Sequence, residues 1–402
     1  IMANVSSSNG LEKRPKLRFP GFDEPYKQCR IGDIYAERSQ RGASNMELLS
    51  VTMNDGVKPR SEIEGKDNSS EDKSNYKIVR KGDMVYNSMR MWQGANGISP
   101  CDGIVSPAYT VLMPTQEINN GYFAALFKSA NMINEFRKNS QGMTSDTWNL
   151  KYPQIETIKI QIPSVSEQDK VSELFGVLDA RIVAQAQLVE SLKKYKRGVV
   201  RTLLSPKHCS IKNVKWTTSR IGDIGIFIKG APLSKADISL EGTPFILYGE
   251  LYTTYSEVIS NVVRKTQASV DKQYYSQIGD VIIPTSGETP EEISTASCVM
   301  LPDIILAGDL NIYRCTQVDG RIMSYILNHV VNDRIARIAQ GKSIVHVQAA
   351  EISKIEITYP DPFSQKTIIA ILAAISDRID QSNAELRLLN ELRKALLQKL
   401  FI

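Results

Sequence analysis

The sequence lacks the features of several common protein classes. It has no apolar run of the roughly 18 residues that cross a membrane, and its first residues carry no signal-peptide pattern. Three histidines and five cysteines are scattered along 402 residues without the spacing of metal ligands. An odd number of separated cysteines is typical of a reducing compartment. We therefore expect a cytoplasmic protein with no membrane contact and no bound metal.

Catalytic motifs are also missing or incomplete. Gly341-Lys342-Ser343 resembles the end of a phosphate-binding loop, but Ala336 stands where that loop requires its first glycine. Asp55, Glu64 and Lys66 are residue types of a metal-dependent nuclease site, yet they lie in a polar stretch typical of a solvated loop. No glycine-rich turn follows a predicted strand, as a dinucleotide or methyl-donor site would need. The sequence therefore predicts no active site and no cofactor bound by this chain.

The composition is that of an ordinary globular protein. Hydrophobic residues make up 42% of the chain and charged residues 23%. A chain of 402 residues can form two or three domains, each with its own core. The net charge of +5 permits nucleic-acid binding without requiring it, because local patches rather than totals attract phosphates.

What the sequence does contain is a long internal repeat. Residues 163–203 and 360–400 match in apolar and polar positions at a constant offset of 197, and such a repeat decides architecture. Apolar residues recur at alternating steps of three and four, which describes a narrow seam on a helix. Each copy runs about 38 residues, or roughly 57 Å at 1.5 Å per residue. We predict two long helices of the kind found in spacers and coiled coils.

Chain order predicts how these helices pair. The first helix leads into the second globular part and the second helix starts there, so their seams can meet only if the helices are antiparallel. Gln185 and Ser382 fall near the midpoints and would meet, and one buried polar layer can fix register. The alternative is two ordinary amphipathic helices packed on separate cores. The predicted pairing positions are Leu178, Ile182, Gln185, Val189, Leu192, Ile375, Ile379, Ser382, Leu386 and Leu389.

Weaker matches relate the globular parts. Residues 31–34 return at 221–224, residues 82–85 at 279–282 and residues 141–142 at 340–341, with offsets of 190, 197 and 199. Both parts share one plan of strands and a helix, so the predicted fold class is α+β. Two globular mixed α/β domains are joined by two long antiparallel helices in an internal pseudo-two-fold repeat. We expect strands at 78–86, 104–113, 155–162, 280–284, 310–315 and 352–359, and helices at 122–139 and 321–338.

The predicted boundaries follow from this plan. Residues 1–15 are rich in Ser and Asn and are expected to be a disordered N-terminus or a cloning remnant. Residues 16–163 and 206–360 form the two globular domains, and residues 164–205 and 361–402 form the two spacer helices. Within the first domain, the segment 16–26 is expected to pack on a neighbour as an arm.

Polar loops carry the binding chemistry. The stretch 87–96 leaves a predicted strand with amides, an arginine and a tryptophan, and its equivalent at 284–289 is rich in hydroxyls. Such side chains can read base edges in the DNA major groove. A second pair of polar loops lies at 141–145 and 340–343, although polar hairpins that bind nothing have the same residue types. The candidate DNA-binding residues are Asn87, Ser88, Arg90, Trp92, Gln93, Asn96, Gln141, Thr144, Ser145, Lys229, Thr285, Ser286, Lys342 and Ser343.

A basic cluster closes the first helix. It is either a solvated helix face or a contact for phosphates or an acidic partner. Lys196, one of its members, and its counterpart Arg393 lie on the predicted seam near the helix ends, where we expect long stems to carry their charges to water. The cluster consists of Lys193, Lys194, Lys196, Arg197 and Arg201.

In combination, these features resemble the specificity subunit of type I restriction-modification systems. The likeness rests on the two repeated helices, the paired Ile-Gly-Asp-Ile and Gly-Asp motifs, and four further segments. These are Pro15 to Phe22, Ser106 to Tyr109, Ile160 to Pro163, and Glu167-Gln168. The second copy has Ser364-Gln365 in place of Glu167-Gln168, and Ala307 to Leu310 in place of Ser106 to Tyr109.

The resemblance implies a non-catalytic, sequence-specific DNA-binding subunit. Each target-recognition domain would read one half of a bipartite site in double-stranded DNA, and unequal loops predict unequal half-sites. Two methyltransferase subunits would grip the helices, and restriction-translocase subunits would join the full complex. S-adenosylmethionine, ATP and Mg would be bound by those partners. The rival interpretations are a coiled-coil scaffold that does not read DNA and a stand-alone metal-dependent nuclease.

Overall fold

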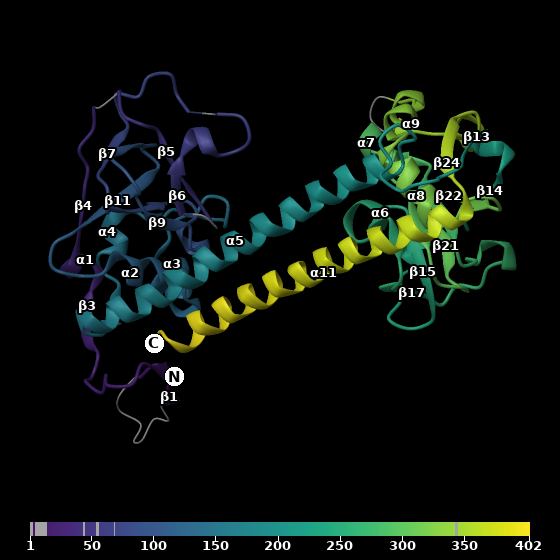
Figure 1. Cartoon of the computed structure of the whole chain (residues 1–402). Helices are drawn as coiled ribbons and strands as arrows, with labels where there is room; N and C mark the ends of the chain where they lie inside the picture. Colours follow the sequence, from purple (N-terminus) through teal and green to yellow (C-terminus); the bar gives the residue numbers. More distant parts are fainter. Residues whose placement is uncertain (1–2, 5–13, 43–44, 54–55, 68, 342–344) are drawn as a thin grey trace. The chain divides into compact units, whose positions relative to one another are not determined.

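The computed structural model describes residues 3–4, 14–42, 45–53, 56–67, 69–341 and 345–402 (Figure 1). The chain divides into two compact units. Unit 1 comprises residues 1–186 and 384–402, and unit 2 comprises residues 187–383. Two long helices, α5 (Val165–Leu203) and α11 (Pro362–Lys399), each contribute one half to each unit. The prediction of two long helices is confirmed.

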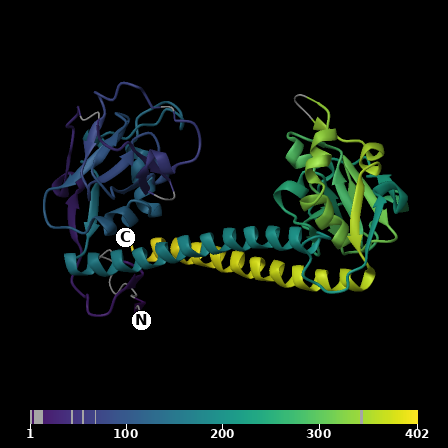
Figure 2. The same cartoon turned by 45° about the horizontal axis from the view of Figure 1, so that its top comes forward.

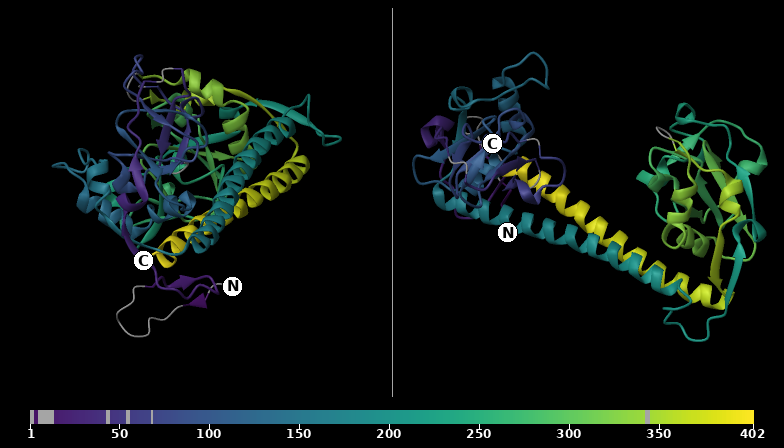
Figure 3. Two further views of the ribbon diagram at one scale, coloured as in Figure 1. Left: turned by 90° about the vertical axis from the view of Figure 1, so that its left-hand side faces the viewer. Right: turned by 90° about the horizontal axis from the view of Figure 1, so that it is seen from above.

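The helices pair in opposite directions. In unit 1 the first half of α5 packs on the last half of α11 (Figure 2). Phe175 stacks there on Phe401, with 5.9 Å between ring centroids. In unit 2 the last half of α5 joins the same core as the first half of α11 (Figure 3). Leu203 and Leu372 are both part of that core. Contacts of early with late segments in both units mean that the helices are antiparallel, as predicted.

The predicted seam is covered along its whole length. All ten predicted pairing positions are buried or half-buried, whereas most helix residues between them are exposed. Arg393 donates to Asp179 across the helix pair of unit 1, with 2.5 Å between Nε and Oδ1. Gln185 and Ser382 are both buried, and their meeting at the midpoint stays a prediction.

Unit 1 is built around a four-stranded antiparallel sheet in the order β4-β11-β8-β9. Short strand pairs flank it, and the helices α2 and α3 complete a core that the ends of α5 and α11 close. Its elements before α5 are β1 (Ala3–Asn4), β2 (Leu17–Arg18), β3 (Lys27–Arg30), α1 (Ile31–Ile34), β4 (Tyr35–Glu37), β5 (Leu49–Thr52), β6 (Gly56–Pro59), η1 (Arg60–Glu62), β7 (Lys77–Val79), β8 (Met84–Asn87), η2 (Met91–Gln93), β9 (Asn96–Ile98), β10 (Gly103–Val105), β11 (Tyr109–Pro114), α2 (Asn120–Leu126), α3 (Ala130–Asn139), α4 (Tyr152–Ile155) and β12 (Lys159–Ile162).

Unit 2 repeats this plan with a five-stranded sheet in the order β14-β22-β18-β20-β16 and a three-stranded sheet β17-β15-β21. Its elements are β13 (Trp216–Arg220), η3 (Ile221–Asp223), β14 (Gly225–Lys229), η4 (Lys235–Asp237), β15 (Thr243–Leu247), α6 (Glu250–Thr253), β16 (Val258–Ile259), β17 (Arg264–Thr266), η5 (Lys272–Tyr274), β18 (Asp280–Pro284), β19 (Ser286–Gly287), α7 (Pro290–Ile293), β20 (Ser297–Val299), β21 (Ile305–Ala307), β22 (Leu310–Cys315), α8 (Gly320–His329), α9 (Asn332–Ile338), β23 (Val345–His346), α10 (Ala349–Ser353) and β24 (Glu356–Pro360).

A glutamine clamp marks the start of each long helix. Gln168 accepts a hydrogen bond from Asn119 N and donates to Pro163 O, both at 3.0 Å. Gln365 accepts from Asp319 N and donates to Pro360 O, both at 2.8 Å. Each clamp ties the first turn of a long helix to the residue that caps α2 or α8. The repeat seen in the sequence therefore extends to side-chain contacts.

Several predicted elements are divided in the structure. The strand expected at 78–86 is β7 and β8, because Gly82, with φ +92°, turns the chain between them. The helix expected at 122–139 breaks at Ser129, whose side chain accepts from Met132 N and starts α3 anew. Residues 104–113 likewise form β10 and β11, and residues 321–338 form α8 and α9. The expected strands at 155–162 and 352–359 each begin in a short helix. Strands β18 and β22 match their predicted bounds.

The predicted arm packs on α5 within unit 1. Arg18 is buried and donates to both carboxylate oxygens of Glu167, at 2.9 and 2.8 Å. The Arg18 guanidinium also lies 4.9 Å from the centroid of the Tyr26 ring. Ala3–Asn4 pairs antiparallel with Leu17–Arg18, so the disorder expected for residues 1–15 does not hold for that pair.

The expectation that Lys196 extends to water is wrong. Its side chain is buried in unit 2, where Nζ lies 2.7 Å from a Glu257 carboxylate oxygen and 5.3 Å from the centroid of the Tyr325 ring. His329 Nε2 lies 2.7 Å from the other Glu257 oxygen. Burial raises the pKa of Glu257, but the His329 hydrogen bond and the Lys196 charge outweigh it and lower that pKa to about 2. The other members of the basic cluster are exposed.

Candidate nucleic-acid interface

The same backbone hydrogen bond ties the earlier predicted loop of each unit to the residue that follows the closed later loop. Leu150 N donates to Ser88 O at 2.8 Å in unit 1, and Val347 N donates to Thr285 O at 3.1 Å in unit 2. Both partners of the second bond lie 197 residues after those of the first. Reciprocal backbone bonds also close the later loop, between 141 and 149 in unit 1 and between 340 and 346 in unit 2. The loops therefore form one composite surface on each unit.

In unit 1 this surface is aromatic and polar. Trp92 from the first loop meets Trp148 from the second edge to face, with 5.2 Å between ring centroids. The Arg137 guanidinium lies 5.4 Å from the centroid of the Trp92 ring. Met143, at the tip of the second loop, is 100% exposed. Gln141, Thr144, Ser145 and Arg90 are exposed, while Asn87 and Gln93 are half-buried. These side chains can meet a ligand.

Two residues of unit 1 that we expected to contact DNA, Asn96 and Ser88, are buried instead. Asn96 is 0% exposed on β9, and its amide donates to Gly94 O at 3.1 Å. Ser88 is buried, and its hydroxyl lies 2.9 Å from that of Thr110. Polar groups that are buried and hydrogen-bonded stabilise the domain. Neither side chain is available to a base, so the structure corrects their assignment to DNA contact.

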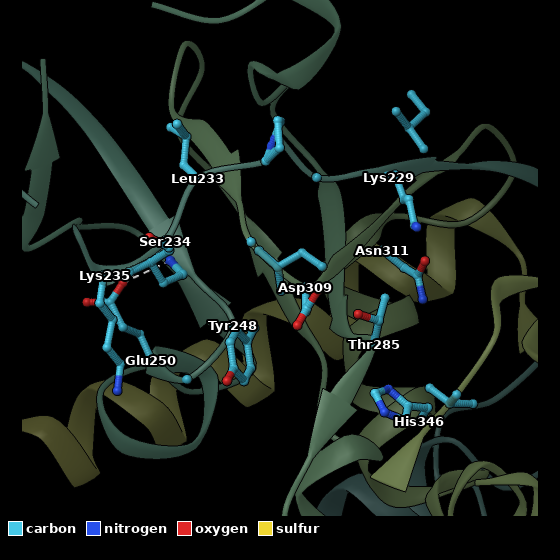
Figure 4. A pocket seen from close by; sticks show the side chains of 18 of the residues that line it. Lys229, Leu233, Ser234, Lys235, Tyr248, Glu250, Thr285, Asp309, Asn311 and His346 are labelled. Atoms are coloured by element: carbon cyan, nitrogen blue, oxygen red, sulfur yellow. Dashed lines mark hydrogen bonds between the residues drawn. The ribbon is translucent and has the colours of Figure 1, made fainter. Parts of the chain in front are cut away.

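In unit 2 the composite surface borders a groove of about 1480 Å³ (Figure 4). Two predicted residues, Lys229 and Thr285, line it. Ser286 does not, because it is buried and donates to Asp309 Oδ2 at 3.0 Å. Lys342 and Ser343 lie outside the described residues. The groove also contains residues that the sequence reasoning missed, namely Lys235, Tyr248, Asp309, Asn311 and His346.

Strand register brings these residues together. In the sheet, Lys229 on β14 stands opposite Asn311 on β22, which stands opposite Ile283 on β18. Thr285 follows β18, and His346 reaches the groove because β23 pairs with β19. Figure 4 shows Lys229, Asn311, Thr285 and His346 one after another along one side of the groove, with Ser234, Lys235 and Glu250 on the other. Residues distant in sequence thus form one polar wall.

The groove carries charges of both signs. Lys229 and Lys235 are exposed, and Asp309 is exposed beside Thr285. Arg264 Nε lies 3.0 Å from Glu250 Oε1, and the other Glu250 oxygen accepts from Leu247 N at 3.1 Å. Cations suit phosphates, and amide, hydroxyl and carboxylate groups suit base edges. The groove therefore offers both kinds of contact that nucleic-acid recognition uses.

The described residues contain no group of three or more His, Cys, Asp or Glu side chains that could hold a metal ion. Among the same residues, no helix is both long enough and apolar enough to span a membrane.

Comparisons with known proteins match both halves of the chain. A family model described as the type I restriction modification DNA specificity domain matches residues 24–194 and again 213–391. The putative type I restriction enzyme MjaX specificity subunit of Methanocaldococcus jannaschii is 23% identical over 294 residues, which is 69% of this chain and 66% of that relative.

Two solved structures share the fold. One is the type I restriction-modification S subunit from M. genitalium, with TM-score 0.59, 15% identity, and coverage of 97% of this chain and 99% of that one. The other comes from a study of complex assembly and conformational transition of the type I restriction-modification system, with TM-score 0.59, 14% identity, and coverage of 94% and 97%.

Proposed function

The chain belongs to the type I restriction-modification DNA specificity family, and on that premise we propose that it selects an asymmetric, bipartite site in double-stranded DNA. Unit 1 reads one half-site and unit 2 reads the other. The observation that carries the proposal is the composite loop surface, which both units form with the same backbone bond but with different side chains. Equal scaffolds with unequal loops are what two different half-sites require.

Unit 1 contacts its half-site through the loop surface around Trp92. Arg90 can form a bidentate pair with guanine, and Gln93 or Gln141 with adenine. Thr144 and Ser145 add hydroxyls on an exposed loop. In unit 2 the groove wall with Lys229 and Thr285 performs this role. Because cations that neutralise phosphates release counterions, binding weakens steeply as salt rises.

The long helices provide the docking surface for partner subunits. Several apolar side chains point away from the seam and are exposed, and such residues often mark protein interfaces. Leu388 and Leu392 lie one turn apart in unit 1, and Leu188 and Tyr195 lie two turns apart in unit 2. We assign two methyltransferase subunits to these faces, joined by restriction-translocase subunits in the full complex. S-adenosylmethionine, ATP and Mg are then bound by those partners.

The test is the methylation pattern of DNA in cells that express this chain with a methyltransferase subunit of the same system. We expect one motif made of two unequal half-sites separated by a fixed gap. The double variant R90A/Q93A should change the specificity of one half-site and leave the other intact. A continuous motif, or equal loss at both half-sites, would contradict the proposal.

The rivals predict different results. A scaffold that does not read DNA gives no salt-sensitive DNA binding even with methyltransferase present. A stand-alone nuclease gives metal-dependent cleavage by the purified chain, which is lost in the variants E64Q and K66A.

A further inference from the structure

The main sheets of the two units, β4-β11-β8-β9 and β14-β22-β18-β20-β16, differ at one pair of equivalent positions. In unit 1, Thr110 stands opposite Tyr86, and in unit 2, Asn311 stands opposite Ile283. Tyr86 and Ile283 are themselves 197 residues apart, as are Ser88 and Thr285 two positions later. Opposite residues of an antiparallel pair lie on the same face of a sheet, and so does a residue two positions along. Ser88 and Thr110 therefore correspond to Thr285 and Asn311.

In unit 1, the side chains at these positions bond to each other. The hydroxyls of Ser88 and Thr110 lie 2.9 Å apart, and both side chains are buried. The Tyr86 side chain is fully buried beside them, and its hydroxyl has no hydrogen-bond partner among the described residues. The Ser88 and Thr110 hydroxyls bond to each other inside the domain, and neither side chain is exposed to a ligand.

In unit 2, one side chain at these positions has a polar atom without a hydrogen-bond partner among the described residues. Asn311 is only 4% exposed, and its amide nitrogen has no hydrogen-bond partner among the residues that the structure describes. A buried donor without a partner destabilises the folded state, so such groups are rare in folded proteins. The smaller Ile283 stands where unit 1 has Tyr86. Because Asn311 lines the groove (Figure 4), a ligand that enters the groove can satisfy it.

The neighbours of Asn311 indicate what that ligand is. Lys229, directly opposite on β14, is exposed and cationic. The offset of 190 that relates residues 31–34 to 221–224 places the neutral Ser39 at the same position in unit 1. An amide and a hydroxyl beside a cation suit a base edge next to a phosphate.

We propose that Asn311 and Thr285 form a base-reading subsite in the groove of unit 2, which takes the major-groove edge of an adenine, directly or through one bridging water, while Lys229 contacts the adjacent phosphate. An asparagine amide donates and accepts at once and so matches N7 and N6 of adenine. A bridging water can transmit such a preference. The inference rests on the proposed function and assigns a residue and a base to one half-site.

The experiment uses the complex of this chain with its methyltransferase and a library of duplexes randomised through both half-sites. N311T, which copies unit 1, should lower the preference for adenine at one position of one half-site by about 5-fold to 150-fold. N311D keeps the shape but only accepts hydrogen bonds, so it should shift that position toward cytosine, whose N4 donates. T285A should weaken the same position, whereas S88A, its matched control in unit 1, should change no base preference.

Any other result would contradict the inference. Unchanged preferences in N311T and N311D would exclude Asn311 from base reading, while a bipartite pattern in the wild-type complex would leave the proposed function intact. Loss of a guanine preference, or equal loss at both half-sites, would assign Asn311 another base or a structural role. A wild-type complex without bipartite methylation would refute the proposed function itself. The shift expected of N311D cannot arise from misfolding, because a misfolded domain acquires no new preference.

Discussion

The two units differ in one of the contacts that hold the first turn of their long helices. Unit 1 joins its arm to its long helix through the buried pair Arg18 and Glu167, whereas unit 2 has Ser364 at the position of Glu167, bonded to Asp361 at 2.7 Å. The glutamine next to each is the same and makes the same two bonds. The glutamine contacts are therefore the same in both units, whereas the contact made by the residue before each glutamine differs. Because of this difference, substitutions at this position should destabilise unit 1 more than unit 2.

The largest effect is expected at the buried ion pair. E167A leaves the Arg18 guanidinium, which is 4% exposed, without its carboxylate, and breaking a buried pair costs about 3–5 kcal/mol. S364A, the matched change, removes only the hydroxyl bond to Asp361 and should cost about 1 kcal/mol, the usual net value of one hydrogen bond. Calorimetry of the full chain should show the transition of unit 1 moving far more than that of unit 2. Equal shifts would mean that Arg18 finds another partner.

The next effect concerns two apolar residues that follow the ends of the two long helices. Leu204 and Phe401 are 197 residues apart, and both are buried, in the cores of unit 2 and unit 1 respectively. L204A and F401A should each cost about 3 kcal/mol through lost burial and the cavity left behind. Each variant should shift only the unfolding transition of its own unit. If either shifts both transitions equally, the two cores are not independent.

The acid dependence of the two units should also differ. The pKa of Glu257 in unit 2 is lowered from 4.5 to about 2, so this group stabilises the folded state above pH 4.5 and loses that contribution as pH falls toward 2. The difference corresponds to at most about 3 kcal/mol. Unfolding free energies between pH 6 and pH 2 should show this loss in unit 2, and E257Q should remove it. An unchanged pH dependence in E257Q would assign the loss to other carboxylates.

The smallest effect is expected on the outer surface of the helix pair. Arg181 and Glu385 lie 2.8 Å apart in unit 1 but both are well exposed, and such pairs contribute about 0.2–1 kcal/mol. R181A should therefore change the free energy of unfolding by less than about 1 kcal/mol. R393A should cost more, because the Arg393 side chain is only 22% exposed where it pairs with Asp179. Urea unfolding of both variants, compared at low and high salt, checks this order.

The sequence predicted the framework of this fold well because periodicity reports burial. The seam positions could be found from spacing, the antiparallel order from chain order, and the strands β18 and β22 from short apolar runs. Strands separated by a glycine turn, such as β7 and β8, merged into one prediction because both are apolar. Lys196 was misplaced because a spacing pattern does not show that Glu257, 61 residues later, meets it in the interior.

The binding surfaces were predictable only in part. Polar residue types after strands led to Trp92, Lys229 and Thr285, which do lie on the loop surface or the groove. The same signal also included Asn96 and Ser286, because residue type does not distinguish a side chain that faces solvent from one that satisfies a neighbour. Asn311 was missed because its place depends on the pairing of β22 with two other strands. A polar residue within the apolar run 310–313 was the one available signal.

The division of the chain bears on how the protein is synthesised. Unit 2 is one uninterrupted stretch, 187–383, so it can reach its native state while the ribosome is still at work. Unit 1 begins earlier but needs Leu396, Leu400 and Phe401 to fill its interior. The part translated first must therefore remain incompletely packed until residues 384–402 have been made.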